Sequence, residues 1–471
     1  MKGLTLKEIA RICGGTLHNC GTDLGEQEVS AITTDSRKVE QGALFVAIPG
    51  ARVDGHSFIP QVMEQGALAA LTERELPEAE YPYIQIRSSL QAVKEIAEFY
   101  LQQLQIPVVG ITGSVGKTST KEMIAAILSQ RYRTLKTEGN FNNELGLPLT
   151  VFRLRDEDEI VVLEMGISDF GEMHRLAKIA RPDTAVLTNI GWCHLENLKD
   201  RDGILKAKTE IFDFLKEDGH IVLNGDDDKL ATVGEVRGVC PIRFGLDENN
   251  DYYADQIEPL GFRGIRCMLH TPEGTVQVQI PMPGSHMVYN ALAGAAVGQI
   301  YGLTLEEIRA GIESLQPVAG RFHIIETENY TVIDDCYNAN PVSMKASLNV
   351  LKDGPGRRVA VLGDMGELGA EEKELHAQVG VCAGESGIDA LYCAGPLSQA
   401  MADAARETNT EMEIYHFADR NTLMEKLPEL LQNGDTVLVK ASHFMEFGKI
   451  VEWLEQNGGE KRQSSEGNSR M

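Results

Sequence analysis

The chain has 471 residues, 42% of them hydrophobic, so it is long enough to form about three domains with buried cores. Its 70 acidic residues outnumber the 44 basic ones, for a formal net charge of −26. Nucleic acids and anionic membrane surfaces are bound by basic faces, so this balance argues against both as partners. Any phosphate group of a substrate must therefore be bound by a local site rather than attracted by the overall charge.

The first eight residues lack the apolar region of a signal peptide, and no run of 18 apolar residues occurs in the chain. Eight cysteines are scattered without a Cys-x-x-Cys pair, which is typical of reduced thiols rather than of disulfides or a zinc site. We therefore expect a cytoplasmic protein that does not insert into a membrane.

Strand-like and helical segments can be followed along the chain. The N-terminal region contains a strand-like segment at 43–48, and a helical segment at 90–104 leads into the next part of the chain. From residue 106 onward strands alternate with helices, which predicts a mostly parallel sheet with helices on both faces. Alternation with period two at 275–280 suggests that residues 241–282 form an antiparallel patch. The predicted strands of the parallel part are 106–111, 160–164, 184–189 and 220–224, and a helix is predicted at 290–301.

A second α/β pattern begins after Arg321, with predicted strands at 358–363, 390–393 and 436–440. The polar residues from 459 onward are rich in Ser, Gly and Glu and are expected to be disordered. These patterns predict an α/β protein with domains at 1–103, 104–317 and 318–458, followed by the tail at 459–471.

The strongest motif is the turn between the strand at 106–111 and a helical pattern at 121–132. A glycine turn in this position directs backbone N–H groups and the positive end of a helix toward an anion. Lys117 could then reach the β- and γ-phosphates of a nucleotide, and Thr118 could offer its hydroxyl to Mg²⁺. The full phosphate-loop pattern has glycine where this chain has Ile111, so an ordinary βα turn remains an alternative. The turn consists of Gly113, Ser114, Val115, Gly116, Lys117 and Thr118.

Two polar residues follow other strands of the same predicted sheet. Glu164 ends one strand and His194 follows the end of another, and ligands of open α/β sheets bind beyond the carboxyl ends of strands. A capping carboxylate and a structural histidine are the alternatives. From the sequence alone Lys208 is interpreted as a solvated helix lysine, and the acidic segment 224–228 as a turn rather than a Mg²⁺ site.

The N-terminal region has two turn-like polar clusters near the strand at 43–48. One contains Ser36 and Arg37 and the other Asp54, Gly55 and His56. They could cap helices, or they could hold a diphosphate through the Ser36 hydroxyl and the Arg37 guanidinium group.

The C-terminal region has two comparable segments, each at the end of a strand. Residues 334–341 carry an unusual density of polar groups, for which a plain turn is the alternative, and glycines in 363–369 permit close approach of a ligand to the backbone.

In this order, the motifs resemble those of the Mur ligase family, ATP-dependent amide-forming enzymes of bacterial cell-wall synthesis. The family's ATP loop runs Thr-Gly-x-x-Gly-Lys-Thr, here Thr112 to Thr118, and therefore lacks a glycine at 111. The resemblance covers nearly the whole chain. It implies a small N-terminal UDP-substrate domain, a central phosphate-loop ATPase domain and a C-terminal Rossmann-like domain that closes over both.

The resemblance also implies roles for individual residues, with ATP and two Mg²⁺ ions as cofactors. Thr118 and Glu164 would hold one ion, and His194 would hold the second together with Lys208 carbamylated by CO₂. The implied catalytic residues are Lys117, Glu164, His194, Lys208 and Asn338. The implied ATP-binding residues are Gly113, Ser114, Gly116, Lys117, Thr118, Ser119, Asn290, Arg321 and Asp335, and the implied UDP-substrate residues are Ser36, Arg37, Asp54, Gly55 and His56.

Within the family, residues 337–341 and 362–369 are typical of the member that joins D-Ala-D-Ala to UDP-MurNAc-tripeptide. The substrate carboxylate would attack the ATP γ-phosphate, and the dipeptide amine would attack the resulting acyl phosphate. Met287 and Ala441 replace an Asn and a Gly that are common in the family. Proteins of two other classes are the alternatives. A folate or cyanophycin-type ligase would lack the segments at 335–341 and 363–369. A nucleotide-binding switch that performs no ligation would not need a second metal site. We expect a monomer that binds both substrates and no nucleic acid.

Overall fold

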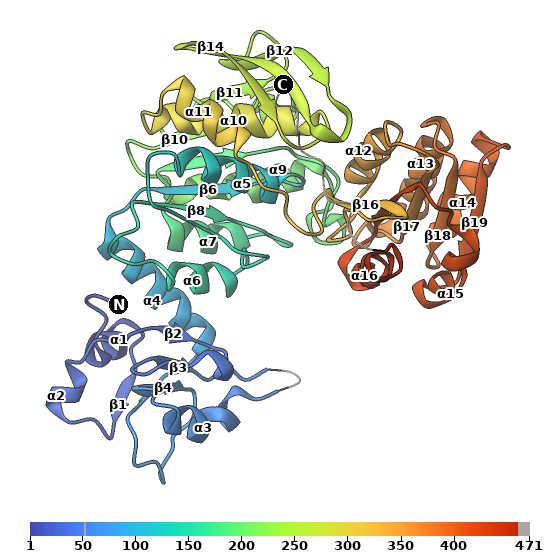
Figure 1. Cartoon of the computed structure of the whole chain (residues 1–471). Coiled ribbons are helices and arrows are strands. Elements are labelled where there is room, and N and C mark those ends of the chain that lie inside the picture. The colour runs from blue at the N-terminus through green and yellow to red at the C-terminus, as the bar shows by residue number, and fades with distance from the viewer. Residues whose placement is uncertain (51–52, 460–471) are drawn as a thin grey trace, which may run out of the picture.

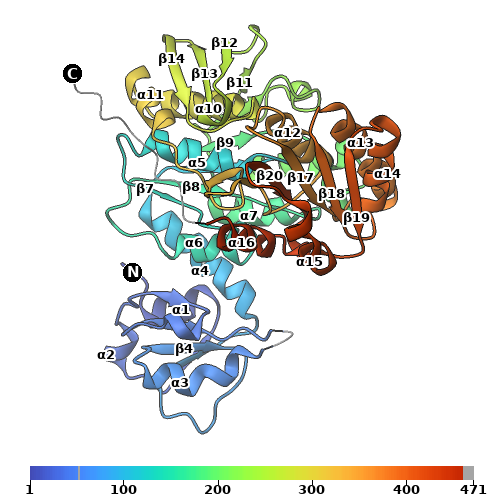
Figure 2. The ribbon, with the colours of Figure 1, turned by 45° about the vertical axis from the view of Figure 1, so that its right-hand side comes forward.

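The computed structural model describes residues 1–50 and 53–459, which form three α/β units (Figures 1 and 2). Each unit is built on its own sheet, of five, nine and six strands along the chain. The expected three-domain α/β architecture is therefore confirmed, while the residue boundaries between domains stay a prediction. The tail expected from 459 lies, but for its first residue, outside the described residues. No helix in the described ranges is long and apolar enough to span a membrane.

The first sheet has the strand order β1-β5-β4-β3-β2, with β1 antiparallel to β5 and the other pairs parallel. The sequence predicts only one of these strands, β3, because it lies within the apolar run at 43–48; strands of two to four residues are too short to show a period by themselves. The elements are α1 (Leu6–Ile12), β1 (Thr16–His18), α2 (Thr22–Gly25), β2 (Ile32–Thr33), η1 (Ser36–Lys38), β3 (Leu44–Val46), η2 (Gly55–Phe58), α3 (Ile59–Glu64), β4 (Ala69–Thr72), β5 (Tyr83–Gln85) and α4 (Ser89–Leu104).

The second sheet has the order β14-β13-β12-β11-β10-β9-β6-β8-β7. Its elements up to β10 are β6 (Val108–Thr112), α5 (Lys117–Leu128), β7 (Thr134–Lys136), α6 (Gly146–Val151), β8 (Ile160–Glu164), α7 (Glu172–Ala180), β9 (Thr184–Leu187), α8 (Leu195–Leu198), α9 (Arg201–Thr209), η3 (Glu210–Phe214) and β10 (His220–Asn224). They continue with η4 (Leu230–Thr232), β11 (Ile242–Gly245), β12 (Tyr252–Pro259), η5 (Gly261–Arg263), β13 (Ile265–Thr271), β14 (Gly274–Ile280), α10 (His286–Ile300) and α11 (Leu305–Glu313).

The antiparallel patch predicted at 241–282 is smaller than expected. Strand β11 pairs parallel with both β10 and β12, and antiparallel pairing begins only between β12 and β13. Period-two alternation reports one exposed face, not strand direction, so the sequence could not separate β11 from the hairpins that follow it.

Helices cover both faces of the parallel part of the second sheet, as predicted (Figure 1). The central strands β6 and β8 are buried along their whole length, and alternate residues of β6 contribute to two hydrophobic clusters. On one face α5 packs against α10 and α11, where a Cβ on Gly311 would lie 2.4 Å from the Ile127 Cα. This close approach holds α5, the helix that follows the phosphate loop.

The third sheet has the order β15-β16-β20-β17-β18-β19, with β15 antiparallel to β16 and the other pairs parallel. Its elements are β15 (His323–Glu326), β16 (Tyr330–Asp334), α12 (Pro341–Leu351), β17 (Arg358–Gly363), η6 (Gly369–Glu371), α13 (Glu372–Glu385), β18 (Ala390–Ala394), α14 (Ser398–Thr408), β19 (Glu413–Phe417), α15 (Arg420–Leu430), β20 (Asp435–Lys440), η7 (His443–Met445) and α16 (Gly448–Asn457).

Helix α4 joins the first unit to the second and packs against α1, α6 and α7. Its Tyr100 is 1% exposed, and the hydroxyl donates a hydrogen bond of 2.9 Å to the Leu154 carbonyl oxygen. We expect Tyr100→Phe to lower the free energy of unfolding by about 1–2 kcal/mol, because a buried carbonyl loses its partner while the packing is kept. Urea unfolding measures the change. Tyr415→Phe is the control, since that side chain is 45% exposed, and equal stability of both variants would contradict the prediction.

Candidate active site

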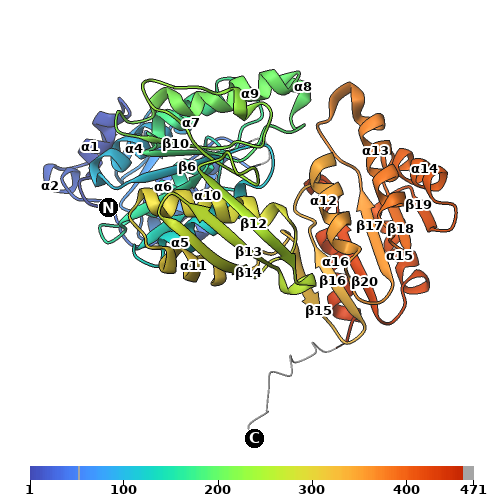
Figure 3. The ribbon, with the colours of Figure 1, turned by 90° about the horizontal axis from the view of Figure 1, so that it is seen from above.

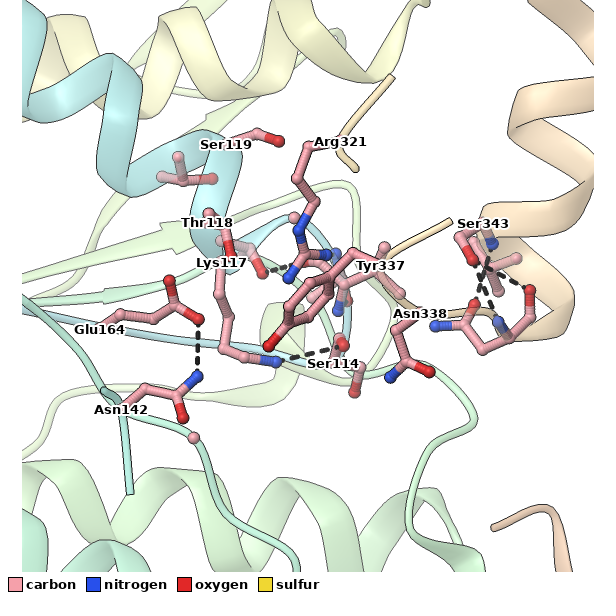
Figure 4. Close-up of a pocket in the computed structure, with 18 of the residues that line it drawn as sticks. Ser114, Lys117, Thr118, Ser119, Asn142, Glu164, Arg321, Tyr337, Asn338 and Ser343 are labelled. Carbon is pink, nitrogen blue, oxygen red and sulfur yellow. Dashed lines mark hydrogen bonds between the residues drawn. The ribbon is translucent and has the colours of Figure 1, made fainter. Parts of the chain in front are cut away.

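A cavity of about 810 Å³ lies between the second and third units, at the carboxyl ends of β6 and β8 (Figure 4). Its wall combines the phosphate loop with the segment between β16 and α12. The predicted site residues that line it are Ser114, Gly116, Lys117, Thr118, Ser119, Glu164, His194, Asn290, Arg321, Asp335 and Asn338.

The phosphate loop has the backbone that its glycines require. Gly113 has φ +151°, and a Cβ there would lie 1.9 Å from the Thr188 Oγ1. Gly116 has φ +82° and precedes the first residue of α5. The predicted helix at 121–132 therefore begins earlier, at Lys117, and ends at Leu128. Its polar first turn hides the start from a search for apolar periodicity.

The end of β9 holds the loop in place. Asn189 accepts two hydrogen bonds from it, one at its backbone oxygen from Ser114 N (3.0 Å) and one at Oδ1 from Val115 N (2.9 Å). Lys117 Nζ donates to the Gly113 carbonyl oxygen at 2.8 Å, and its burial lowers the pKa of the ammonium group. A cationic side chain folded against its own loop is available to contact a phosphate placed there.

Glu164 ends β8 and is 2% exposed. Its Oε1 accepts a hydrogen bond from Asn142 Nδ2 at 2.8 Å, and the Lys121 Nζ lies 3.8 Å from Oε2. Oε2 is buried and accepts no hydrogen bond from the described residues. A buried carboxylate oxygen without such a partner fits a cation bound nearby, since it would otherwise cost free energy. The Thr118 hydroxyl, also buried, lines the same cavity and could share that cation.

Lys208 is not the solvated helix lysine that the sequence alone indicates. It lies on α9 with 1% of its surface exposed, because this face of the helix packs into the domain. Within the described ranges no residue forms a hydrogen bond or ion pair with its Nζ. Burial, together with the charge of Lys117, lowers the pKa of Lys208 to about 8. Lys208 is therefore close to the site although it does not line the cavity.

His194 lies in the left-handed region with φ +51° and precedes α8. Its Nδ1 is 2.7 Å from Glu367 Oε2, so the contact joins the second unit to the third. Glu367 belongs to the segment 363–369, but its charge alone does not distinguish it in the sequence.

Asn290 and Arg321 both line the cavity, Asn290 from α10 and Arg321 from the segment between α11 and β15. Asn290 Oδ1 accepts a hydrogen bond from Thr120 Oγ1 at 2.8 Å, and its Nδ2 is 3.3 Å from the Met287 Sδ. The side chain thus ties α10 to α5. The Arg321 guanidinium carbon lies 3.9 Å from the centre of the Tyr337 ring, a cation–π contact at the cavity wall (Figure 4).

Lys440, which the sequence analysis did not single out, organises the C-terminal wall of the cavity. It is 2% exposed at the end of β20, and its Nζ forms an ion pair with Asp335 and donates to the Asn338 carbonyl oxygen at 3.1 Å. Asp335 also accepts a hydrogen bond of 2.6 Å from Ser347 Oγ. A lysine directly after three apolar strand residues is the signal that could have identified it.

The predicted UDP-substrate residues lie in the first unit and do not line the cavity. Asp54 Oδ1 contacts the His56 Nδ1 at 2.7 Å, and this bond and the one to Arg74 lower the pKa of Asp54 to about 2. His56 is buried, and its Nε2 accepts a hydrogen bond of 3.3 Å from Glu73 N. Both ring nitrogens of His56 are thus occupied within the protein, which makes it a residue that shapes the loop.

The remaining predicted UDP-substrate residues are Gly55 and the pair Ser36 and Arg37. A Cβ on Gly55 would lie 2.7 Å from the Ile48 backbone nitrogen, so the loop approaches β3 closely. Arg37 is exposed and forms an ion pair of 2.8 Å with Asp35, while Ser36 begins η1 beside it. Arg37 is therefore the predicted UDP-substrate residue with the most accessible charge.

The acidic segment 224–228 forms a turn, as the sequence indicates. Asp227 accepts hydrogen bonds from the backbone nitrogens of Ile190 and Leu230, both at 2.9 Å, and Asp228 forms an ion pair with Arg201. These carboxylates stabilise the loop beside the cavity.

Comparisons with known proteins agree over nearly the whole chain. Family models match in three places: the Mur ligase family catalytic domain at 28–101, the Mur ligase middle domain at 111–298 and the Mur ligase glutamate ligase domain at 320–443. A UDP-N-acetylmuramoyl-tripeptide–D-alanyl-D-alanine ligase of Escherichia coli (strain K12) is 40% identical, covering 97% of this chain and 100% of the relative. The corresponding ligase of Bacillus subtilis (strain 168) is 37% identical, covering 96% and 98%.

Solved structures of MurF ligases are also similar to this chain. A crystal structure of MurF from Acinetobacter baumannii has a TM-score of 0.86 and 33% identity, covering 96% of this chain and 99% of that one. The MurF ligase of Thermotoga maritima in complex with ADP has a TM-score of 0.80 and 31% identity, covering 93% and 99%. With its phosphate loop and strand-end carboxylate in one cavity, and with these matches, the chain belongs to the Mur ligase family.

Proposed function

We propose that this chain is an ATP-dependent ligase that joins D-Ala-D-Ala to UDP-MurNAc-tripeptide in cytoplasmic synthesis of peptidoglycan precursors. The E. coli and B. subtilis relatives carry the name of that activity, and the T. maritima structure contains ADP. The observation that supports it most is the cavity, in which Lys117 and the polar segment before α12 face each other from two domains. A phosphoryl donor and an amine acceptor could meet there.

The reaction follows from the chemistry of carboxylates, which are poor electrophiles. An oxygen of the tripeptide's terminal carboxylate attacks the ATP γ-phosphorus, ADP leaves, and an acyl phosphate forms. The neutral amine of D-Ala-D-Ala then attacks the acyl carbon, phosphate leaves, and the nitrogen loses a proton. Lys117 would move from the Gly113 carbonyl to the phosphates, where its charge stabilises the transferring group together with the loop's N–H groups.

Residues of the cavity fit Mg²⁺, which would neutralise phosphate charge when bound. The buried Oε2 of Glu164 and the Thr118 hydroxyl would hold one ion. His194 and carbamylated Lys208 would hold a second. The buried amine of Lys208 supports this modification, because only a neutral amine reacts with CO₂ and a pKa of about 8 leaves a larger neutral fraction. The carbamate would also replace a buried cation near Lys117 by an anion.

The remaining ligand contacts are assigned by position. The nucleotide would contact Asn290, Arg321 and Asp335, besides Gly113, Ser114, Gly116 and Ser119 of the loop region. The UDP group would lie on the first unit, where Ser36 and Arg37 meet the diphosphate and Asp54, Gly55 and His56 shape the neighbouring loop. We assign a monomeric enzyme. Phosphate release from ATP that requires both UDP-MurNAc-tripeptide and D-Ala-D-Ala tests the function, and release without either acceptor would contradict it.

Lys117→Ala should lower the ligation rate by a factor of about 10²–10³ or more, because the charge on the transferring phosphoryl group loses its partner. Binding of UDP-MurNAc-tripeptide, measured by calorimetry, should change little, since that ligand is assigned to another domain. Lys178→Ala, which removes a half-exposed lysine of the same domain, is the control. Wild-type turnover of the Lys117 variant would remove the phosphate-loop assignment.

Lys208→Ala should be nearly inactive and should regain part of its activity with short carboxylic acids, which can occupy the place of the carbamate. In the unaltered protein, ¹³CO₂ should produce a carbamate carbon signal by NMR, and Lys208→Ala should lack it. Lys206→Ala, on the same helix, should keep the signal. Full activity of Lys208→Ala, or of the parent protein in CO₂-free buffer, would contradict the assignment of carbamylated Lys208 as a metal ligand.

Asn338→Ala should depress the coupled rate more than it weakens ATP binding, because the segment at 335–341 would hold the amine within attack distance. Asn349→Ala, an exposed position on α12, is the control. D-Ala-D-Ala should be preferred over D-Ala, since the shorter ligand leaves polar groups of the pocket unpaired. Equal use of D-Glu, lysine or diaminopimelate would refute the acceptor assignment even with an intact ATP site.

A further inference from the structure

The second and third units touch at a small contact away from the linker that joins them. Helix α8 lies beside the turn that leads into α13, as the view from above shows (Figure 3). A Cβ on Gly369 would lie 3.9 Å from the Leu195 Cβ, so the backbones approach closely. Beside this approach, Glu367 Oε2 lies 2.7 Å from the His194 Nδ1.

Both partners of this pair have a backbone conformation that non-glycine residues seldom adopt. The φ angle is +51° at His194 and +62° at Glu367. Such residues persist where their surroundings impose the conformation, and they concentrate at functional sites. Two such residues meet here, at the boundary between the second and third units, and this makes the contact a candidate for a functional role.

The contact between His194 and Glu367 contributes little to the stability of the protein. The Glu367 side chain is 62% exposed and that of His194 is 25% exposed. Ion pairs with this exposure contribute little to the free energy of folding. The pair bears instead on the state of the imidazole ring: Nδ1 faces the carboxylate at 2.7 Å and is the nitrogen expected to carry the proton, which in a neutral ring leaves the lone pair on Nε2.

The Nε2 of His194 is the nitrogen that remains available. No residue in the described ranges forms a hydrogen bond with it, and His194 lines the cavity that also contains Lys117 and Glu164. Histidines that bind metals commonly donate their other ring nitrogen to a carboxylate, which orients the ring.

We propose that Glu367 is the positioning residue for His194 and that it makes the second metal ion depend on docking of the C-terminal domain. The inference rests on the proposed function in that it takes His194 as a metal ligand. Glu367 comes from the third unit, so the ring is held for metal binding only while the two units touch. By linkage, a bound ion then favours the docked arrangement to the same extent.

The test measures metal binding directly, by electron paramagnetic resonance of Mn²⁺ titrated into the full-length protein with ADP. Glu367→Ala should weaken binding of one Mn²⁺ by about 10–100-fold. Glu367→Gln should weaken it less, because the amide oxygen still accepts from Nδ1–H. Glu371→Ala is the matched control: it removes an exposed carboxylate four residues further along the chain, in η6, and should leave the affinity unchanged.

A double-mutant cycle separates positioning from a structural effect. In a His194→Ala background, Glu367→Ala should have no further effect on Mn²⁺ affinity. Parent-like Mn²⁺ binding by Glu367→Ala, or an equal loss with and without His194, would overturn the proposal. The assay uses neither UDP-MurNAc-tripeptide nor D-Ala-D-Ala, so its result is independent of whether the proposed ligation is correct.

Discussion

The site depends on the close approach of the phosphate loop to the end of β9. Gly113 leaves no room for a side chain against Thr188, and the Thr188 Oγ1 donates a hydrogen bond of 2.7 Å to the Val115 carbonyl oxygen. Asn189 completes the contact through its backbone and side chain. Because β6 and β9 are neighbours in one sheet, the loop is fixed to the same frame as the strand ends that carry the other polar residues. The loop's N–H groups therefore need no rearrangement to meet an anion.

Around this frame the protein buries charges that a stable core alone would not need. Glu164, Lys208 and Lys440 are each at most 2% exposed. Burying a charge is costly unless it is paired, and these residues differ in how that cost is met. Lys440 is paired with Asp335, whereas one oxygen of Glu164 accepts no hydrogen bond from the described residues and burial lowers the pKa of Lys208. Ligands are thus expected at Glu164 and Lys208, the buried charged groups that are incompletely paired. The fully paired Lys440 instead holds a loop in place.

The division of the chain into units has a chemical consequence. ATP and the acceptor amine are assigned to facing walls that belong to different domains, so the complete site exists only in certain domain arrangements. An acyl phosphate reacts with water, and a site that is assembled by docking limits this loss. The contact between His194 and Glu367 lies at the boundary between the second and third units and joins them in the docked arrangement.

How much the sequence predicts depends on the range of the interactions involved. Gly113, Gly116 and Lys117 could be identified because a phosphate loop is a local structure, and the long buried strands could be found because their apolar runs are local too. The order of these motifs also sufficed for the resemblance to the Mur ligase family. By contrast, the burial of Lys208, the parallel pairing of β11 and the partners of His194 and Lys440 were decided by segments far away in the chain. The pattern around Lys208 is the same for a solvated helix and for a buried one, and only the packing of α9 distinguishes them. Local residue order therefore determined which chemical groups the chain carries, whereas burial and pairing, which depend on contacts between distant segments, were decided only by the tertiary structure.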